Sequence, residues 1–430
     1  KTARHVLGGR VMSGVKRLLV ANVHYAPWSY GGATVVVEAM CERLVRDHGW
    51  QVLVLTTFFD PSIASYTLRR YTVNGVDIAA ICVPSNLPYR DKYLNRNYDL
   101  IAKRVIDAFA PDVAHVHCVQ NMGAGCIKHL VDSGVPTAVT VHDAWWWCER
   151  QFLITDQGVF CHQTKVDHRI CRYCITDVNV TLERKSELMS ILGSVDKVLF
   201  PSDYFRGLGV ANGLLAERCQ TNKNGVLPPK PGFQRSRSPV LRFGYVGGPG
   251  PNKGVMQILR AFREIKRTDY ELVIVDAAQN LGRSWRNEID WSVPGKLVFH
   301  PAYQQATIDG FFGSIDVLLF PSLWKESFGL TVREALLRNV WVIASDAGGT
   351  AEDCEDGVNS TVIPMSTDHK RLKAAITALL EKGLPSDYEN PHRSAIVTSD
   401  EQASELSRLL HNLSAPAKAA PDRITETARS

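Results

Sequence analysis

The sequence predicts an α/β protein of two domains, each built on a parallel sheet of Rossmann type. Strand-like apolar segments alternate with helical segments along most of the chain, a pattern typical of parallel sheets covered by helices. Two turns between a strand and a helix are rich in glycine, at 31–34 and 247–254. With 430 residues, 45% of them hydrophobic, the chain is long and apolar enough for two full cores.

The first domain is expected over residues 17–227, after an N-terminal extension or tag at 1–16. An apolar strand at Arg17–Val23 leads into a turn that contains Gly31 and Gly32, and then into a helix. Glycine lets the backbone of this turn approach a ligand, and the helix N-terminus attracts an anion. The alternation continues through a helix at Tyr98–Phe109 and strands at Gln51–Thr56, Asp112–His117, Thr137–Val141 and Asp196–Phe200.

A histidine, His142, directly follows the strand at Thr137–Val141. Doubly wound sheets bind ligands just beyond the carboxyl ends of their strands, which favours a functional role for His142. The alternative is a helix cap or a hydrogen-bond partner of Asp143. His117 ends the preceding strand, and it either lines the same crevice or has a structural role.

Four cysteines lie close together in an insertion at 145–175 that departs from an ordinary sheet connection. Twelve, nine and two residues separate them, so the last two form a Cys-x-x-Cys pair. Thiolates at such spacing are typical ligands of a structural Zn²⁺, which would fold a loop that lacks a core of its own. Disulfides, an iron–sulfur cluster, or a site in which His162 or His168 replaces one thiolate are the alternatives. The candidate ligands are Cys148, Cys161, Cys171 and Cys174.

A Pro-, Ser- and Arg-rich run at 228–239 is the expected linker to a second domain at 240–398. The second series of strands and helices begins at Leu241–Val246. Its later elements are expected as strands at Leu272–Val275, Lys296–Phe299, Ile315–Phe320 and Val340–Ala344 and a helix at Leu372–Leu380.

The glycine-rich turn at 247–254 matches neither of two common nucleotide-binding motifs. A dinucleotide fingerprint needs a glycine where this chain has Lys253, and a Walker loop needs a serine or threonine where it has Gly254. The turn therefore predicts neither a dinucleotide site nor a P-loop.

The stretch 320–336, FPSLWKESFGLTVREAL, carries two carboxylates on either side of a link from a strand into a helix. At a helix N-terminus free N–H groups and the helix dipole suit a diphosphate, and Gly329 allows its close approach. Glu334 can accept hydrogen bonds from two vicinal hydroxyls, as a ribose requires. Glu326, on the loop, would face the group attached beyond the phosphates. A nucleotide-sugar fits this arrangement.

This stretch resembles the signature of two glutamates separated by seven residues in the retaining family-4 glycosyltransferases of GT-B fold. Lys253 and Gly254 resemble the family's Lys-Gly pair that opens a helix, and 348–352 resembles its glycine-rich loop at the cleft rim. Many relatives place an arginine where this chain has Gly248. The resemblance implies two Rossmann-like domains that face each other across a cleft. It also implies that a helix at 399–413 returns to the first domain, before a flexible tail at 414–430.

The resemblance implies roles for individual residues. His142 and Glu326 would hold the transferred sugar, and Lys253 would neutralise the charge that develops on the leaving diphosphate. The residues implied in binding the nucleotide-sugar donor are Gly31, Gly32, Gly247, Lys253, Phe328, Gly329, Leu330, Thr331 and Glu334.

The implied reaction is a metal-independent, retaining transfer of a sugar to a hydroxyl of a glycan or lipid-linked glycan. The biological setting would be assembly of a polysaccharide such as O-antigen, capsule or exopolysaccharide. No Asp-x-Asp triplet occurs, which argues against a metal-bridged transferase of the GT-A fold. The alternatives are a nucleotide-sugar epimerase of GT-B fold and a degenerate transferase that serves as a binding scaffold.

Charge and hydropathy limit the partners of the chain. A net charge of +5 does not indicate a nucleic-acid-binding protein. No apolar run approaches the roughly 18–20 residues of a spanning helix, and the first residues do not form a signal peptide. We therefore expect a cytoplasmic protein, soluble or peripheral at the inner face of the membrane. A start at Lys1 and an Ala/Pro-rich end also fit a piece of a longer polypeptide with further domains, or residual tag residues.

Overall fold

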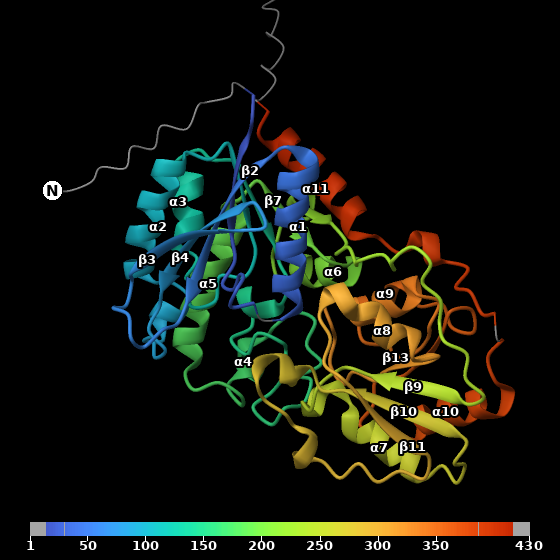
Figure 1. Ribbon diagram of the computed structural model, residues 1–430. Helices are drawn as coiled ribbons and strands as arrows, with labels where there is room; N and C mark the ends of the chain where they lie inside the picture. Colours follow the sequence, from blue (N-terminus) through green and yellow to red (C-terminus); the bar gives the residue numbers. More distant parts are fainter. Residues whose placement is uncertain (1–13, 30, 386, 416–430) are drawn as a thin grey trace, which may run out of the picture.

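The computed structural model describes residues 14–29, 31–385 and 387–415, and it contains two sheets, each covered by helices (Figure 1). Most of the expected extension at 1–16 and of the expected tail at 414–430 lies outside the described residues. No helix among the described residues is long and apolar enough to cross a membrane.

The N-terminal sheet has eight strands in the order β3-β4-β2-β1-β5-β6-β7-β8. All neighbouring pairs are parallel except β3 and β4. The strands are β1 (Arg17–Ala21), β2 (Gln51–Phe58), β3 (Leu68–Val73), β4 (Val76–Cys82), β5 (Val113–Val116), β6 (Thr137–Thr140), β7 (Lys197–Phe200) and β8 (Cys219–Thr221). The helices are α1 (Gly32–His48), α2 (Arg96–Phe109), α3 (Gly125–Asp132), α4 (His168–Cys171), α5 (Val178–Ser194) and α6 (Asp203–Ala211).

The C-terminal sheet has six parallel strands in the order β11-β10-β9-β12-β13-β14. The strands are β9 (Leu241–Tyr245), β10 (Tyr270–Val275), β11 (Lys296–His300), β12 (Val317–Phe320), β13 (Trp341–Ser345) and β14 (Ser360–Ile363). The helices are α7 (Val255–Arg263), α8 (Ile308–Gly313), α9 (Leu330–Leu337) and α10 (Lys370–Lys382).

The chain order explains where a ligand can bind. In the N-terminal sheet β1 lies between β2 and β5, and in the C-terminal sheet β9 lies between β10 and β12. At these positions the connections diverge to opposite sides of the sheet, which leaves a crevice at the carboxyl ends of the strands. The turns that follow β1, β9 and β12 are the ones that carry the predicted site residues.

Burial patterns account for the elements. All five residues of β13 are buried, as expected of a strand covered by helices on both faces. In α7 the buried residues Val255, Ile258, Leu259 and Phe262 recur at helical spacing and face the core of the C-terminal domain.

The last helix, α11 (Ser399–Leu413), packs beside α1 of the N-terminal domain (Figure 1). The Arg43 guanidinium lies 2.6 Å from a carboxylate oxygen of Asp400, and the Trp50 indole N–H donates to the Ser407 hydroxyl at 2.9 Å. The chain therefore passes between the domains twice, once near 228–239 and once before α11.

The antiparallel hairpin of β3 and β4 at the sheet edge was not predicted. Only two of the six side chains in β3 belong to strongly apolar residues, Leu68 and Val73, so the strand carries a weak burial signal. Asn74 and Gly75 join the strands with positive φ angles of 50° and 81°. Asn-Gly is the usual sequence of such a turn, and this was the one signal that pointed to the hairpin.

The predicted zinc site in the insertion is not confirmed. All ten cysteines are free thiols, which also excludes the disulfide alternative in this structure. Among the described residues, no group of three or more His, Cys, Asp and Glu side chains is arranged to hold a metal ion. Cys148, Cys161, Cys171 and Cys174 line one cavity of about 20 Å³, together with His168.

The zinc prediction assumed a loop without a core, whereas the insertion packs on the core of the N-terminal domain. Trp147, Leu153, Phe160 and Val166 are buried in the main cluster of the N-terminal domain. Cys171 is buried with them, and burial raises the pKa of its thiol. Apolar packing against the domain therefore contributes to the fold of this loop.

Candidate active site

Two helix N-termini meet where the domains face each other. Gly31 precedes α1 with φ 84°, and Gly329 precedes α9 with φ 87°, a backbone region that favours glycine. In the described part of the chain, no side chain caps either helix start. A Cβ atom on Gly32 would lie 3.1 Å from Cδ1 of Leu330, so the two turns are in close contact. Uncapped N–H groups from both domains thus converge on one place, which suits an anion.

Lys253 and Glu326 form an ion pair beside these turns. The Lys253 ammonium lies 2.8 Å from Oε1 of Glu326 and 4.8 Å from the centre of the Trp324 ring. The same Oε1 atom accepts hydrogen bonds from the Trp324 indole at 2.8 Å and the Ser322 hydroxyl at 2.9 Å. The carboxylate is 8% exposed and is held from three sides. Its second oxygen is the one left for a ligand.

The turn at 247–254 is fixed by close backbone contact. Gly254 has φ 80°, and a Cβ atom there would collide with the carbonyl oxygen of Pro321. A Cβ atom on Gly247 would lie 2.6 Å from the Tyr245 hydroxyl, which donates to the carbonyl of Gly248 at 2.6 Å. Glycine at these positions lets the turn lie against the loop after β12, which brings Lys253 to Glu326.

Glu334 lies on α9 and is 6% exposed. Burial raises the pKa of its carboxyl group, while Arg338 and a hydrogen bond from Gln305 act in the opposite direction. The Gln305 amide donates to Oε1 of Glu334 at 3.4 Å. Leu330 and Thr331 form the first turn of this helix, and Phe328 is buried below it.

His142 belongs to a row of three histidines at the ends of β5 and β6. Its Nε2 atom lies 2.9 Å from Nδ1 of His117, and the rings stack 5.2 Å apart. The His117 ring lies 4.1 Å from that of His115, whose Nε2 atom contacts the Thr140 hydroxyl at 2.7 Å. Burial lowers the pKa of His142 to about 4 and that of His115 to about 3. The imidazole of His142, which lines this side of the crevice, is therefore neutral near pH 7, as is the buried imidazole of His115.

A cavity of about 480 Å³ lies between the two domains, within the usual range for a small-molecule site. Its N-terminal wall includes Gly31, Gly32 and His142, and its C-terminal wall includes Trp324 and Ser327. Lys253, Glu326 and Glu334 are not among its lining residues; Glu326 is joined to it through Trp324. Of the predicted set, the structure thus brings Gly31, Gly32 and His142 to the cavity wall, and Lys253 and Glu326 to its back.

Several residues of the site were missed by sequence reasoning. Arg333 is buried and donates to the carbonyls of Phe328, Gly349 and Thr350, and its Nε atom pairs with Asp353 at 2.7 Å. It fixes both loops of the C-terminal face. The sequence did not reveal Arg333, because an arginine on a helix usually faces solvent.

Contacts between the domains were missed as well. Glu352 accepts a hydrogen bond at 2.6 Å from the backbone N–H of Tyr204, in the first turn of α6. The Ser202 hydroxyl donates to the carbonyl of Ser327 at 2.6 Å. Such pairs join segments more than a hundred residues apart, so no local pattern could reveal them.

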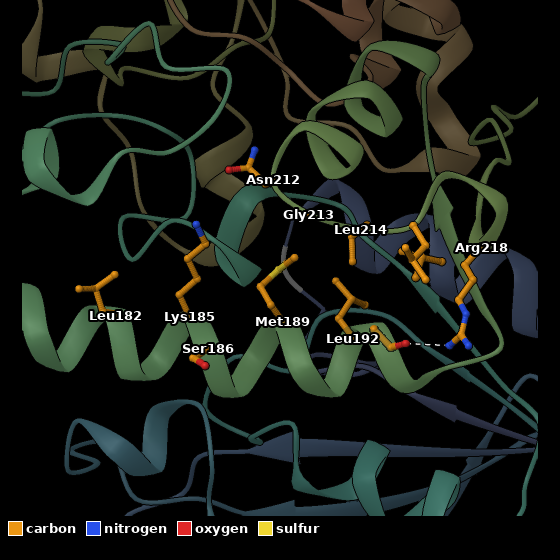
Figure 2. A pocket seen from close by; sticks show the side chains of 12 residues that line it. Leu182, Lys185, Ser186, Met189, Leu192, Asn212, Gly213, Leu214 and Arg218 are labelled. Carbon is orange, nitrogen blue, oxygen red and sulfur yellow. Dashed lines mark hydrogen bonds between the residues drawn. The ribbon is translucent and has the colours of Figure 1, made fainter.

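A second hollow of about 380 Å³ lies away from the cleft, on the outer side of the N-terminal domain. Figure 2 shows Leu182, Lys185, Met189 and Leu192 projecting from α5 toward Asn212 and Leu214. None of the predicted site residues lines it. The interdomain cavity is therefore the better candidate for the functional site.

Comparison with known families identifies both halves of the chain. Residues 30–228 match the family described as Glycosyltransferase Family 4, and residues 234–396 match the family described as Glycosyl transferases group 1. Together the two matches cover most of the chain.

Curated relatives agree with these matches. The chain is 27% identical over 368 residues to a phosphatidyl-myo-inositol mannosyltransferase of Mycolicibacterium smegmatis, with 83% of each chain covered. It is 26% identical over 175 residues to a lipopolysaccharide 1,2-N-acetylglucosaminetransferase of Salmonella typhimurium. That match covers 37% of this chain and 44% of the relative.

Solved structures share the fold. A glycosyltransferase from Rickettsia africae aligns with TM-score 0.66 and 12% identity over 93% of this chain and 99% of the other. HepE of Anabaena in complex with UDP and glucose aligns with TM-score 0.61 and 13% identity over 92% of this chain and 99% of the other. From the two family matches, the relatives and the shared GT-B fold, we conclude that this chain belongs to the family-4 glycosyltransferases.

Proposed function

We propose that the protein transfers a sugar from a nucleotide-diphosphate-sugar to a hydroxyl of a glycan or lipid-linked glycan, with retention of the anomeric configuration. The observation that carries this proposal is the meeting of the uncapped starts of α1 and α9 beside the Lys253–Glu326 pair. Two helix N-termini and one ammonium form a site for a diphosphate, which is the charged part of such a donor.

The donor would lie across the C-terminal face. Glu334 would accept hydrogen bonds from the ribose hydroxyls, and its burial beside Gln305 leaves room for a second partner on the carboxylate. The backbone amides of Phe328, Gly329 and Leu330, with Lys253, would hold the diphosphate. In support of this donor class, HepE of Anabaena was solved with UDP-glucose.

Charge development explains how this arrangement would accelerate transfer. As the anomeric bond breaks, negative charge grows on the diphosphate and positive charge grows on the sugar. Backbone amides at the two helix starts, together with Lys253, would stabilise this charge more in the transition state than in the ground state. Lys253 would have to leave Glu326 or share it with the donor, because the pair is closed at 2.8 Å.

Retention needs no protein nucleophile in this scheme. The acceptor hydroxyl would attack from the face that the diphosphate leaves, and a phosphate oxygen would take its proton. His142 and the free oxygen of Glu326 would bind hydroxyls of the transferred sugar. Because the pKa of His142 is lowered to about 4 by burial, the imidazole is neutral near pH 7 and serves as a hydrogen-bonding group.

The finer setting is also a proposal. The relatives named above act on lipopolysaccharide and on phosphatidyl-myo-inositol. We therefore place the acceptor among lipid-linked glycans of a cell-surface polysaccharide, which would bring the protein to the inner face of a membrane.

The first experiment is a thermal-shift screen with UDP-, GDP- and ADP-sugars, followed by a turnover assay with the best donor. A donor that binds only the folded state raises the melting temperature. At a donor concentration of about a hundred times Kd, it adds about 2.7 kcal/mol to the free energy of unfolding. Stabilisation by one class and release of its nucleoside diphosphate support the proposal. If no nucleotide-sugar stabilises the protein, the proposal is wrong; if one is converted without an acceptor into an epimer, the epimerase alternative replaces it.

A further inference from the structure

The cysteine-rich insertion at 145–175 reaches across the cleft and contacts both loops of the C-terminal face. The ring of Phe152 lies edge-on to that of Trp324, with centroids 4.9 Å apart and planes at 90°. A Cβ atom on Gly158 would lie 3.7 Å from Cγ of Pro251, in the turn that carries Lys253. The insertion therefore forms part of the wall of the interdomain cavity.

A buried carboxylate links the insertion to the N-terminal wall. The Gln151 amide donates to Oδ2 of Asp143 at 2.7 Å, and the Gln120 amide donates to the same oxygen at 3.2 Å. The backbone N–H of Trp145 donates to Oδ1 at 2.9 Å. Asp143 and both glutamines line the cavity, next to His142. These contacts fix the direction of all three side chains.

One polar atom of this group has no partner. The Oε1 atom of Gln120 is buried and accepts no hydrogen bond within the described residues. A buried acceptor without a donor is unfavourable by about 1–3 kcal/mol, and such atoms in native folds are commonly satisfied by a ligand or water. A sugar hydroxyl can supply the hydrogen-bond donor that this oxygen atom lacks.

The backbone of the same wall is held in unusual conformations. Asn121, Gln151 and Leu153 line the cavity with φ angles of 64°, 64° and 55°, a region that glycine normally occupies. Hydrogen bonds hold the loop there: Ala144 N–H donates to the Gln151 carbonyl at 2.9 Å, and Cys161 N–H donates to the Leu153 carbonyl at 2.9 Å. Strain that the surrounding fold maintains is typical of ligand-binding segments.

We infer that Gln151, Gln120 and Asp143 bind hydroxyl groups of the acceptor sugar and that Phe152 packs against its ring, so that the insertion selects the acceptor. This inference rests on the proposed function. The ligand class is a pyranose with free neighbouring hydroxyls, because an oriented carboxylate and an amide accept from two hydroxyls and an aromatic ring covers an apolar face of a sugar. The donor contacts proposed above are Gly31 and His142, and the lining residues Gln120, Asp143, Gln151 and Phe152 are then assigned to the acceptor.

The test compares two glutamines of the same insertion. Gln151→Ala removes the side-chain amide that donates a hydrogen bond to Asp143. Gln157→Ala removes an exposed glutamine that does not line the cavity. Gln151→Asn is the conservative variant, since asparagine tolerates a positive φ and keeps the amide. Thermal melting of all three variants checks that the fold is intact.

The readout separates acceptor from donor. Methyl α-glycosides of mannose, glucose, galactose and N-acetylglucosamine are offered to the protein in the presence of the nucleoside diphosphate that stabilises it best. Ligand-observed NMR measures their binding, and hydrolysis of the donor without acceptor measures the donor site. We expect Gln151→Ala to weaken binding of the preferred glycoside by about 10- to 100-fold, Gln151→Asn to recover part of it, and Gln157→Ala to change nothing. Donor hydrolysis should stay within about twofold in Gln157→Ala, and in Gln151→Ala it should fall by less than glycoside binding does.

Three results would overturn the inference while leaving the proposed function in place. In the first, the wild-type protein hydrolyses the donor but binds none of the glycosides. In the second, wild type and Gln151→Ala bind the glycosides equally well. In the third, Gln151→Ala loses glycoside binding and donor hydrolysis to the same extent. A wild-type protein that neither binds nor hydrolyses any donor overturns the proposed function itself, and the inference falls with it.

Discussion

The two walls of the interdomain cleft are built from different chemistry. Behind the C-terminal wall lie charges that already have partners: Lys253 is paired with Glu326, and Arg333 with Asp353. The N-terminal wall carries the imidazole of His142, whose pKa is lowered by burial, and an acceptor atom of Gln120 that has no partner within the described residues. A diphosphate needs a positive environment, whereas an uncharged sugar needs hydrogen-bonding groups with free capacity. The contrast supports the proposed placement of the donor diphosphate on the C-terminal side and of the acceptor sugar on the N-terminal side.

The largest effect is expected where the loops of the C-terminal wall are fixed. Arg333→Met would leave Asp353 buried with only Lys223, at 2.8 Å, to balance it, and would free the carbonyls of Gly349 and Thr350. Loss of one partner of a buried ion pair costs about 3–5 kcal/mol, so the free energy of unfolding should fall by that order. Urea denaturation measures it. Arg267→Met, at an exposed pair, is the control and should leave the free energy of unfolding nearly unchanged.

The second effect is a loss of turnover when Lys253 is removed. Lys253→Ala removes the only side-chain cation that the proposal places on the diphosphate, and kcat should fall by about 100- to 1000-fold, as for other single electrostatic contacts in a transition state. Steady-state kinetics with saturating donor measures it. Lys296→Ala, on the far edge of the same sheet, is the matched control. Turnover near the wild-type rate would show that Lys253 does not act on the leaving group.

The close packing at the start of α9 can be tested with a pair of glycines. Gly329→Ala places a Cβ atom 2.7 Å from the Thr350 hydroxyl at φ 87°, whereas Gly383→Ala, at φ 72°, meets nothing within 4 Å. Both variants carry the strain of a positive φ, so their difference reports the close approach itself. We expect donor affinity to fall at least about tenfold in the first and to stay unchanged in the second, as measured by calorimetry. Equal donor affinities of the two variants would mean that Gly329 does not contribute to donor binding.

The smallest effect concerns protonation of the N-terminal wall. The pKa of His142 is lowered to about 4, so between about pH 6.5 and 4 the unfolded chain binds a proton that the folded protein does not. The free energy of unfolding therefore falls as the pH falls through this range, by up to about 1.4 kcal/mol per pH unit for this one histidine. Asp143 opposes it over part of the range, because burial raises its pKa to about 6.

A variant isolates the histidine from these other groups. His142→Gln should lose less stability than the wild type between pH 6.5 and 4.5, as measured by thermal melting at each pH. Identical pH profiles would mean that His142 is protonated in the folded protein, and the neutral wall would have to be abandoned.

The same contrast explains what could be predicted from the sequence. The C-terminal side of the site is made by short contiguous segments, 247–254 and 320–336, in which strand, glycine and helix follow one another. Local patterns were therefore sufficient to propose Glu326 and Glu334, and the family resemblance added Lys253. The N-terminal wall joins Gln120, Asp143 and Gln151 from separate loops, and their contact depends on how the insertion folds.

The four cysteines of the insertion also meet through packing. The Cys-x-x-Cys pair at 171 and 174 lies on α4 and the turn after it, and Cys148 and Cys161 approach it because the insertion packs on the domain. Spacing indicates that thiols can meet, but it does not say whether a metal or an apolar core brings them together.

The most direct test of the account is the affinity of the protein for a nucleoside diphosphate compared with that for the nucleoside alone, measured by calorimetry with the base chosen by the thermal-shift screen. The account predicts that the diphosphate binds at least about 100-fold more tightly, and that Gly329→Ala removes most of this difference. Equal affinities for nucleoside and diphosphate would contradict a diphosphate site between the starts of α1 and α9.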